Sequence, residues 1–187
     1  MPHGEVSEII PAPSQAVFDL IHDYARRLEW DTLLRAAYLT DGHTVAAKGV
    51  TSVCVGRWTL GSIALKTIYV TFDRPTLAAV KMVNQPPFFQ AWAASIHHED
   101  LSPTESRVTY KFQFTSKPRL LRFILEPLMG QVFLWETRKR LQALKAYFTK
   151  NSRNPVSRRP LKGVAEKSRN AAKDKNRVSF ESKEQSQ

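Results

Sequence analysis

The sequence has a single cysteine, Cys54, among 187 residues. No disulfide can form within the chain, which excludes the small secreted scaffolds that depend on such crosslinks and favours a reducing compartment. No run of residues reaches the roughly 18 uncharged apolar positions of a membrane-spanning helix, and the first residues lack the basic and then apolar segments of a signal peptide. We therefore expect a cytoplasmic protein with no transmembrane segment.

The motifs of common nucleotide-binding and hydrolytic enzymes are also missing. The sequence has no glycine-rich phosphate loop, no serine in a nucleophile elbow and no pair of cysteines spaced for zinc. His97 and His98 precede two carboxylates, but neighbouring residues of a strand point to opposite faces, so both imidazoles cannot easily bind one ion. Cys54 lies between two valines, and an apolar setting disfavours a nucleophilic thiolate. We predict no metal site and no cofactor, and no residue stands out as catalytic.

The composition is that of a globular domain followed by a basic tail. Of the residues, 42% are hydrophobic and 24% charged, and 4 Trp, 5 Tyr and 10 Phe supply apolar surface for a core. The formal net charge is +11, and the last 37 residues hold 10 of the 28 basic side chains but only 4 of the 17 acidic ones. This segment also has few apolar residues, and burying them could not offset the entropy lost when the segment becomes ordered. We predict a domain over residues 1–150 and a disordered basic tail over residues 151–187.

The first part of the chain shows the pattern of two short helices followed by an antiparallel sheet. A strand over residues 5–10 ends at two prolines, and Ser14 is suited to cap the helix that follows. A second short helix is predicted over residues 24–30, or continuing toward residue 34. Turn signals then separate segments of alternating character, and each gap is too short for a crossover helix. The clearest strand covers residues 107–115, where apolar and polar side chains alternate.

Apolar residues recur at helical spacing over residues 120–148, which predicts a long amphipathic C-terminal helix. Its predicted buried face carries Leu121, Ile124, Leu125, Leu128, Val132, Trp135, Leu141, Leu144 and Phe148. Its predicted solvent face is basic and carries Arg138, Lys139, Arg140, Lys145 and Lys150. Pro127 and Gly130 should kink this helix or divide it into a short arm and a main helix. The chain is thus predicted to be α+β, with a curved antiparallel sheet of about seven strands, two short helices after the first strand and one long C-terminal helix.

A single helix, about 10 Å across, cannot fill the concave face of a twisted sheet of about seven strands. Aromatic and aliphatic side chains around the remaining space would form an apolar pocket, which a hydrophobic ligand fills better than water does. The candidate ligand-binding residues are Trp58, Tyr69, Met82, Trp92, Tyr110 and Phe112. Ordinary core packing is the alternative for each of them, because most buried aromatic side chains simply pack.

Five stretches of the sequence together resemble a known superfamily. They are residues 10–19 (IPAPSQAVFD), 23–24 (DY), 30–31 (WD), 138–141 (RKRL) and 144–145 (LK). Their residues and their order resemble the polyketide cyclase/dehydrase-like branch of the START and birch-pollen-allergen superfamily, also called the helix-grip or SRPBCC group. The resemblance covers about residues 4–149 and does not extend to the basic tail. It implies the helix-grip fold and the binding of a hydrophobic small molecule such as a lipid, sterol, quinone or polyketide, with catalysis in only some members.

Three functions therefore compete. The first is non-catalytic binding or transport of a hydrophobic small molecule between the sheet and the C-terminal helix. The second is a cyclase or dehydrase in which Tyr69, His97 or Tyr110 positions a polyketide-like substrate and transfers a proton. The third is docking of the basic tail on nucleic acid or on an anionic membrane surface. Acidic residues interspersed in the tail weaken the third function, and the sequence gives no indication of the oligomeric state.

Overall fold

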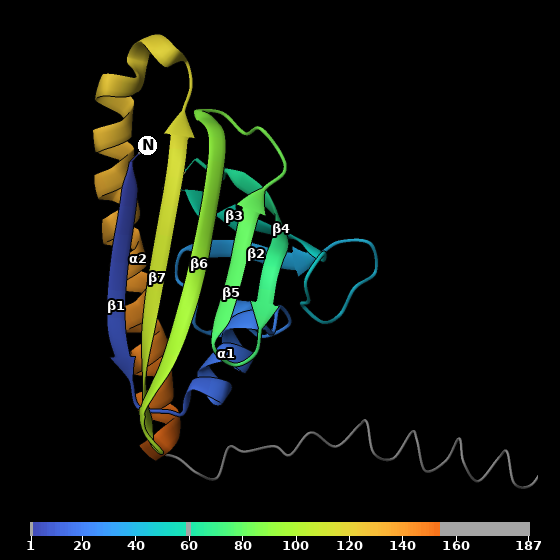
Figure 1. Ribbon diagram of the computed structural model, residues 1–187, viewed down its shortest axis with the longest axis vertical. Coiled ribbons are helices and arrows are strands. Elements are labelled where there is room, and N and C mark those ends of the chain that lie inside the picture. Colours follow the sequence, from blue (N-terminus) through green and yellow to red (C-terminus); the bar gives the residue numbers. More distant parts are fainter. Residues whose placement is uncertain (1, 59–60, 154–187) are drawn as a thin grey trace, which may run out of the picture. The chain divides into compact units, whose positions relative to one another are not determined.

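The computed structural model describes residues 2–58 and 61–153, and in this part of the chain seven strands form one antiparallel sheet (Figure 1). The strands are β1 (His3–Ile10), β2 (Leu34–Leu39), β3 (Thr51–Gly56), β4 (Ala64–Asp73), β5 (Leu77–Met82), β6 (Phe89–Ser102) and β7 (Glu105–Ser116). Their order across the sheet is β1-β7-β6-β5-β4-β3-β2. The predicted α+β class is confirmed.

Four helical segments accompany the sheet in the described residues. They are α1 (Ser14–His22), the short 3-10 helices η1 (Arg27–Glu29) and η3 (Arg119–Leu121), and the long helix α2 (Arg122–Arg153). The second predicted short helix is therefore a single 3-10 turn rather than a helix over residues 24–30. Of the predicted tail, residues 154–187 lie outside the described residues.

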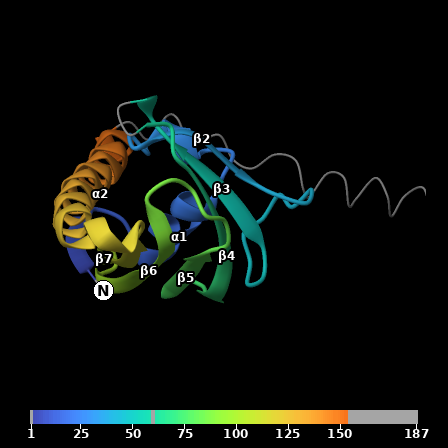
Figure 2. The same cartoon turned by 90° about the horizontal axis from the view of Figure 1, so that it is seen from above.

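The sheet is curved, and bulges contribute to its curvature. The register shifts between β6 and β7, between β4 and β5, and between β2 and β3. Each such irregularity bends a strand and increases its right-handed twist. Seen from above, the strands follow an arc, with α2 beside β1 at one end and β2 at the other (Figure 2). The helix-grip arrangement predicted from the sequence is confirmed.

The strand β7 supplies the centre of the apolar inner face. Val108, Tyr110, Phe112 and Phe114 are buried, and the polar residues between them are exposed or half-buried. The alternation predicted over residues 107–115 is thus confirmed as far as Phe114, whereas Thr115, predicted on the exposed face, is buried. These side chains join the main hydrophobic core, which also contains residues of α1 and Leu141 and Leu144 of α2.

The start of α1 is held by a carboxylate from a distant part of the chain. Asp100, on β6, accepts hydrogen bonds from the Ser14 amide at 2.6 Å and from the Ser14 hydroxyl at 2.9 Å. These bonds hold the pKa of Asp100 below its ordinary value. The prediction that Ser14 caps the helix is wrong, because Pro13 occupies the cap position and makes no side-chain cap bond. The Ser14 amide, which has no partner within the helix, is instead satisfied by a tertiary contact that the local sequence does not reveal.

The helix α2 runs as one helix through Pro127 and Gly130, so the predicted division into two helices does not occur. Its first turns extend past the end of β1 (Figure 1). As a result, part of the predicted buried face is exposed, namely Leu121, Ile124, Leu128, Val132 and Trp135, whereas Leu141 and Leu144 are buried as predicted. None of the helices in the described residues combines the length and apolar composition needed to cross a membrane.

Gly4 allows β1 to pack tightly against Phe112 of β7 and Leu134 of α2, and a substitution there tests the contact between β1 and α2. A Cβ atom at this position would lie 2.9 Å from Leu134 Cδ2 of α2 and would also overlap the Phe112 ring. We therefore expect Gly4→Ala to lower the free energy of unfolding by about 1–3 kcal/mol, measured by urea denaturation. Gly130→Ala is the matched control, because a Cβ there meets nothing within 4 Å and should raise helix stability by up to about 1 kcal/mol. Equal effects of the two variants would contradict this packing.

Candidate ligand-binding cavity

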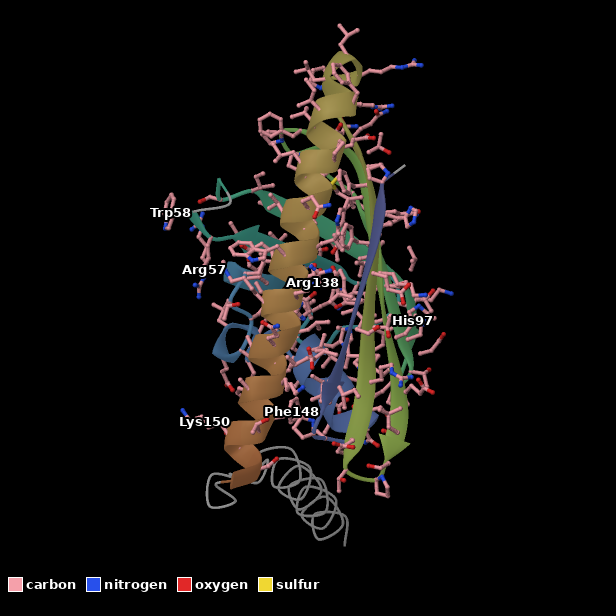
Figure 3. All side chains as sticks on the ribbon, turned by 90° about the vertical axis from the view of Figure 1, so that its left-hand side faces the viewer. Arg57, Trp58, His97, Arg138, Phe148 and Lys150 are labelled. Atoms are coloured by element: carbon pink, nitrogen blue, oxygen red, sulfur yellow. The ribbon has the colours of Figure 1, made fainter. Side chains whose placement is uncertain are left out.

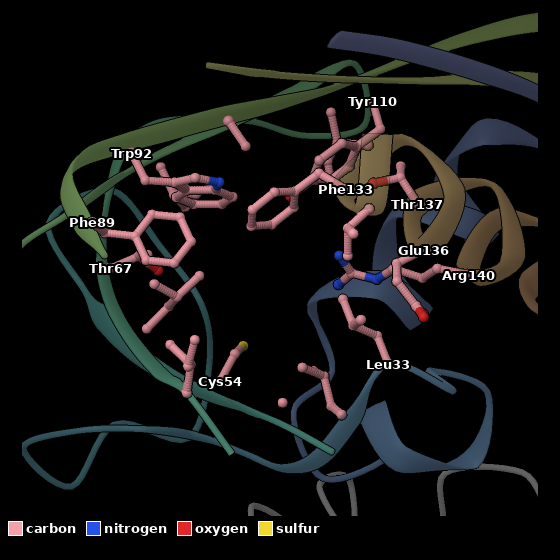
Figure 4. Close-up of a pocket in the computed structure, with 18 of the residues that line it drawn as sticks. Leu33, Cys54, Thr67, Phe89, Trp92, Tyr110, Phe133, Glu136, Thr137 and Arg140 are labelled. Atoms are coloured by element: carbon pink, nitrogen blue, oxygen red, sulfur yellow. The ribbon is translucent and has the colours of Figure 1, made fainter. Parts of the chain in front are cut away.

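A cavity of about 450 Å³ lies between the concave face of the sheet and α2. Its volume falls in the range of small-molecule binding sites, which is about 300–1,000 Å³. Side chains of β3 to β7 form one wall, and residues of α2 between Leu125 and Arg140 form the other. Figure 4 shows Phe89, Trp92 and Cys54 on the sheet side, opposite Thr137 and Arg140 of α2. The space that one helix was expected to leave unfilled is therefore present.

The walls of the cavity are mainly apolar. The apolar lining comprises Leu33, Leu34, Ile63, Leu65, Val80, Phe88, Phe89, Trp92, Ile96, Leu125, Leu128, Met129, Val132 and Phe133, with smaller residues between them. Trp92 also brings a polar group: its indole Nε1 is buried and has no hydrogen-bond partner among the described residues. A buried donor without a partner is unfavourable by about 1–3 kcal/mol. A guest with an acceptor oxygen would relieve this cost.

A buried ion cluster lies at the other side of the cavity. One oxygen of Asp31, Oδ2, accepts hydrogen bonds from Arg27 Nε at 2.9 Å and from Arg140 Nε at 2.8 Å. Arg27, Asp31 and Arg140 are only 5%, 2% and 8% exposed. Both guanidinium groups also lie over the Trp30 ring, at 4.9 Å and 5.7 Å from its centroid. Aromatic faces attract cations, which helps to hold these charges in an apolar setting.

The cluster carries one positive charge in excess, because two guanidinium groups share one carboxylate. Burial disfavours the charged form of Arg27, but the Asp31 carboxylate and neighbouring groups favour that form more strongly. The pKa of Arg27 therefore lies above its ordinary value. Glu136 also lines the cavity, but its carboxylate faces Lys139 at 3.9 Å. Arg27 and Arg140 both line the cavity. This side of the cavity is therefore suited to an acidic or strongly polar oxygen.

Sequence reasoning missed both arginines. The prediction that Arg140 lies on the solvent face of the C-terminal helix is wrong. The available signal was spacing: Arg140 follows Phe133 and Thr137 by seven and three residues, which places all three on one helix face. A basic residue next to two other basic residues was assigned to solvent because buried arginines are rare.

The remaining polar groups of the lining are uncharged at neutral pH. The hydroxyls of Tyr24 and Tyr69 lie 3.0 Å apart, and burial raises the pKa of Tyr69 and of Tyr110 well above the ordinary value. Burial also raises the pKa of the Cys54 thiol to about 11. His22 Nδ1 donates to the Phe18 carbonyl at 2.8 Å, and burial lowers the pKa of His22 to about 3. These groups present hydrogen-bond donors and acceptors but no anion at neutral pH.

The structure brings together three of the six predicted site residues. Tyr69, Trp92 and Tyr110 line the cavity and are buried. Their contact with a ligand stays a prediction.

The other three predicted residues lie outside the lining. Phe112 is buried in the core with its ring centroid 5.5 Å from that of Phe133, and Met82 packs against the same core. Trp58 is 79% exposed, with the Arg35 guanidinium 4.8 Å from its ring centroid. Figure 3 shows Trp58 at the periphery of the molecule, away from α2.

Solved structures with this fold are numerous. An aromatase/cyclase, Zhui, from Streptomyces sp. R1128 is 11% identical, with a TM-score of 0.67 over 82% of this chain and 97% of that one. A START superfamily protein from Mycobacterium smegmatis is 9% identical, with a TM-score of 0.63 over 79% and 97%. The protein XoxI from Bacillus cereus is 17% identical, with a TM-score of 0.63 over 80% and 96%. At these identities the likeness shows the fold alone.

The family follows from the sequence. The model of the family described as polyketide cyclase/dehydrase and lipid transport matches residues 1–149. The chain belongs to this family, as its resemblance predicted. No curated protein matches the sequence as a relative.

The ion cluster gives a test of how this side of the cavity is held together. Asp31→Ala would leave two buried guanidinium groups without their carboxylate, so we expect it to lower the free energy of unfolding by about 3–5 kcal/mol. The matched control is Asp19→Ala, which removes an exposed ion pair with Arg74 and should change stability by less than about 1 kcal/mol. Chemical denaturation of the two variants measures the difference. Similar losses in both would show that Asp31 is not the counterion of a buried cluster.

Proposed function

We propose that the protein binds a hydrophobic small molecule in the cavity between the sheet and α2, without catalysing a reaction on it. The observation that carries the proposal is an apolar cavity of about 450 Å³ with two buried arginines on one side. Membership of a family whose description includes lipid transport supports the binding of a hydrophobic molecule. A lipid, sterol, quinone or polyketide-like molecule has the apolar body that such walls favour. The cytoplasmic location expected from the sequence is part of this proposal.

The proposed ligand has a polar head as well as an apolar body. The excess positive charge of Arg27 and Arg140 lies in a low-dielectric setting, where a charge-assisted hydrogen bond is stronger than in water. The Trp92 Nε1 group and the Tyr24 and Tyr69 hydroxyls add donors around the same space. We infer that the bound molecule places an acidic or strongly polar oxygen toward the arginines and its hydrocarbon part toward the sheet.

The cyclase or dehydrase alternative is less well supported by the arrangement of the residues it named. His97 lies outside the cavity lining, on β6, where its Nε2 lies 3.2 Å from the Ser95 hydroxyl. Tyr69 and Tyr110 do line the cavity, but burial raises their pKa, which disfavours release of their protons near neutral pH. Docking through the basic tail concerns residues that lie almost entirely outside the described part, so no contact supports it.

Filling the cavity tests the proposed binding directly. Ala94 lines the cavity on β6, whereas the exposed Ala91 does not line it. We expect Ala94→Phe to weaken binding of the apolar probe phenylnaphthylamine by at least about tenfold, because the added ring occupies the ligand's space. Ala91→Phe should leave the affinity unchanged. Titration calorimetry measures both, and native mass spectrometry with solvent extraction identifies any molecule retained by the wild-type protein. Equal affinity of the two variants would reject the cavity as the binding site.

The polar head is tested with a second probe that carries an acidic group. Anilinonaphthalene sulfonate has the same rings as phenylnaphthylamine plus a sulfonate. We expect Arg140→Met to weaken binding of the sulfonate probe by about tenfold and to change binding of the neutral probe by less than about twofold. Competition between the two probes shows that they share one site. An equal loss for both would mean that Arg140 supports the fold of the cavity rather than a ligand's charge.

A further inference from the structure

The first half of α2 carries an apolar surface that no described part of the chain covers. We call it the mouth face and define it by Phe88, Leu120, Leu121, Phe123, Ile124, Leu128 and Trp135, whose exposed fractions lie between 46% and 85%. Single exposed apolar residues are ordinary, but a contiguous group on one face marks a surface that another molecule covers. Within α2, Ile124, Leu128 and Trp135 follow one another by four and seven residues and form a stripe along the helix, and Phe123 lies beside this stripe.

The mouth face is continuous because the loop before β6 is tied to the start of α2. The Lys117 amide donates to the Phe88 carbonyl at 2.9 Å, and Arg122 Nε donates to the Ser116 carbonyl at 2.9 Å. Arg122 also bonds the side chain of Gln90 on β6. Phe88 and the first turns of α2 therefore belong to one surface rather than to independent segments.

The cavity opens onto this same surface. Phe88 and Leu128 line the cavity and are 52% and 61% exposed, and Val132 beside them is 41% exposed and also lines it. Side chains that contact both the cavity and solvent form its rim. An apolar guest would therefore enter or leave across the mouth face.

The charges around the mouth face are mainly positive. Its flanking basic residues are Lys117, Arg119, Arg122, Arg138 and Lys139, and Lys139 Nζ lies 3.8 Å from the centroid of the Trp135 ring. The two acidic residues of the same stretch pair with two of these cations: Glu126 accepts from the Ser116 amide at 3.1 Å and lies 3.9 Å from Arg122, and Glu136, which lines the cavity, lies 3.9 Å from Lys139. Five cations against two carboxylates leave a net charge of +3 around the mouth face. The covering partner should combine negative charge with an apolar interior.

We propose that the mouth face docks on an anionic lipid bilayer, with the apolar stripe entering the headgroup region and the basic residues contacting lipid phosphates. A basic amphipathic helix surface binds membranes in this way without crossing them. A second copy of the chain is a poorer partner, because two surfaces with the same positive charge repel each other. Docking itself does not depend on the proposed ligand binding; only the passage of a guest through the rim rests on that function.

An environment-sensitive label on Phe123 tests this docking. The full chain with Cys54→Ser and Phe123→Cys carries a nitrobenzoxadiazole group at position 123, and the matched control carries it at Tyr38→Cys, an exposed position on β2 at the far edge of the sheet. With vesicles of phosphatidylcholine and about 30% phosphatidylglycerol, we expect a severalfold rise and a blue shift of fluorescence at position 123 only. Pure phosphatidylcholine vesicles should give a much smaller change, and added salt should reduce the signal. Vesicle binding without a change at position 123 would overturn the proposal and assign binding to another part of the chain.

Paired variants separate this proposal from ligand binding. We expect Leu120→Glu with Phe123→Glu to reduce vesicle co-sedimentation by at least about tenfold, whereas Tyr38→Glu leaves it unchanged. Neither Leu120 nor Phe123 lines the cavity, so both variants should bind phenylnaphthylamine in solution as tightly as the wild-type protein does. If the wild-type protein does not bind phenylnaphthylamine, that result counts against the proposed ligand binding and leaves membrane docking untouched. Concentration-dependent self-association that the double variant abolishes, without insertion into vesicles, would reject the bilayer in favour of a second copy. Unchanged co-sedimentation of the double variant would also overturn the proposal.

Discussion

The Asp31 carboxylate joins two parts of the chain that are more than a hundred residues apart. Through one oxygen it holds Arg27 of η1 and Arg140 of α2, so the segment after α1 and the long helix meet at the cavity. Its second oxygen accepts from the Leu33 amide at 3.2 Å, just before β2 begins. A buried charge cluster of this kind adds little net stability over apolar packing, but it specifies one arrangement of the elements around it. This contact fixes α2 to the segment before β2 beside the cavity, and Leu141 and Leu144 pack the same helix into the core.

The fold was predictable because its signals are periodic and local. The alternation over residues 107–115 identified β7, and the turn signals between successive strands identified an antiparallel sheet. Errors arose where a distant residue decides the local structure. Ser14 looks like a cap, yet Asp100 satisfies the start of α1 from the far end of β6. Pro127 looks like a helix boundary, yet α2 continues through it.

The site was predictable only in part because lining residues depend on strand register and helix rotation. Of the aromatic residues predicted to bind a ligand, Tyr69, Trp92 and Tyr110 line the cavity, but Trp58 is exposed. Aromatic character alone does not separate these positions, since register decides which face of a strand a side chain occupies. Arg140 shows the opposite error, because it was predicted to be exposed and is buried. Its charge favoured solvent, but the Asp31 carboxylate and the Trp30 and Tyr110 rings, all distant in sequence, offset the cost of its burial.

The high pKa of Cys54 has a consequence for the chemistry of the cavity wall. A thiolate, rather than a thiol, reacts with peroxides and other electrophiles. Since burial holds the pKa of this thiol near 11, little of the reactive form exists at neutral pH. The Cys54 sulfur atom in the lining therefore resists conversion to sulfenic acid.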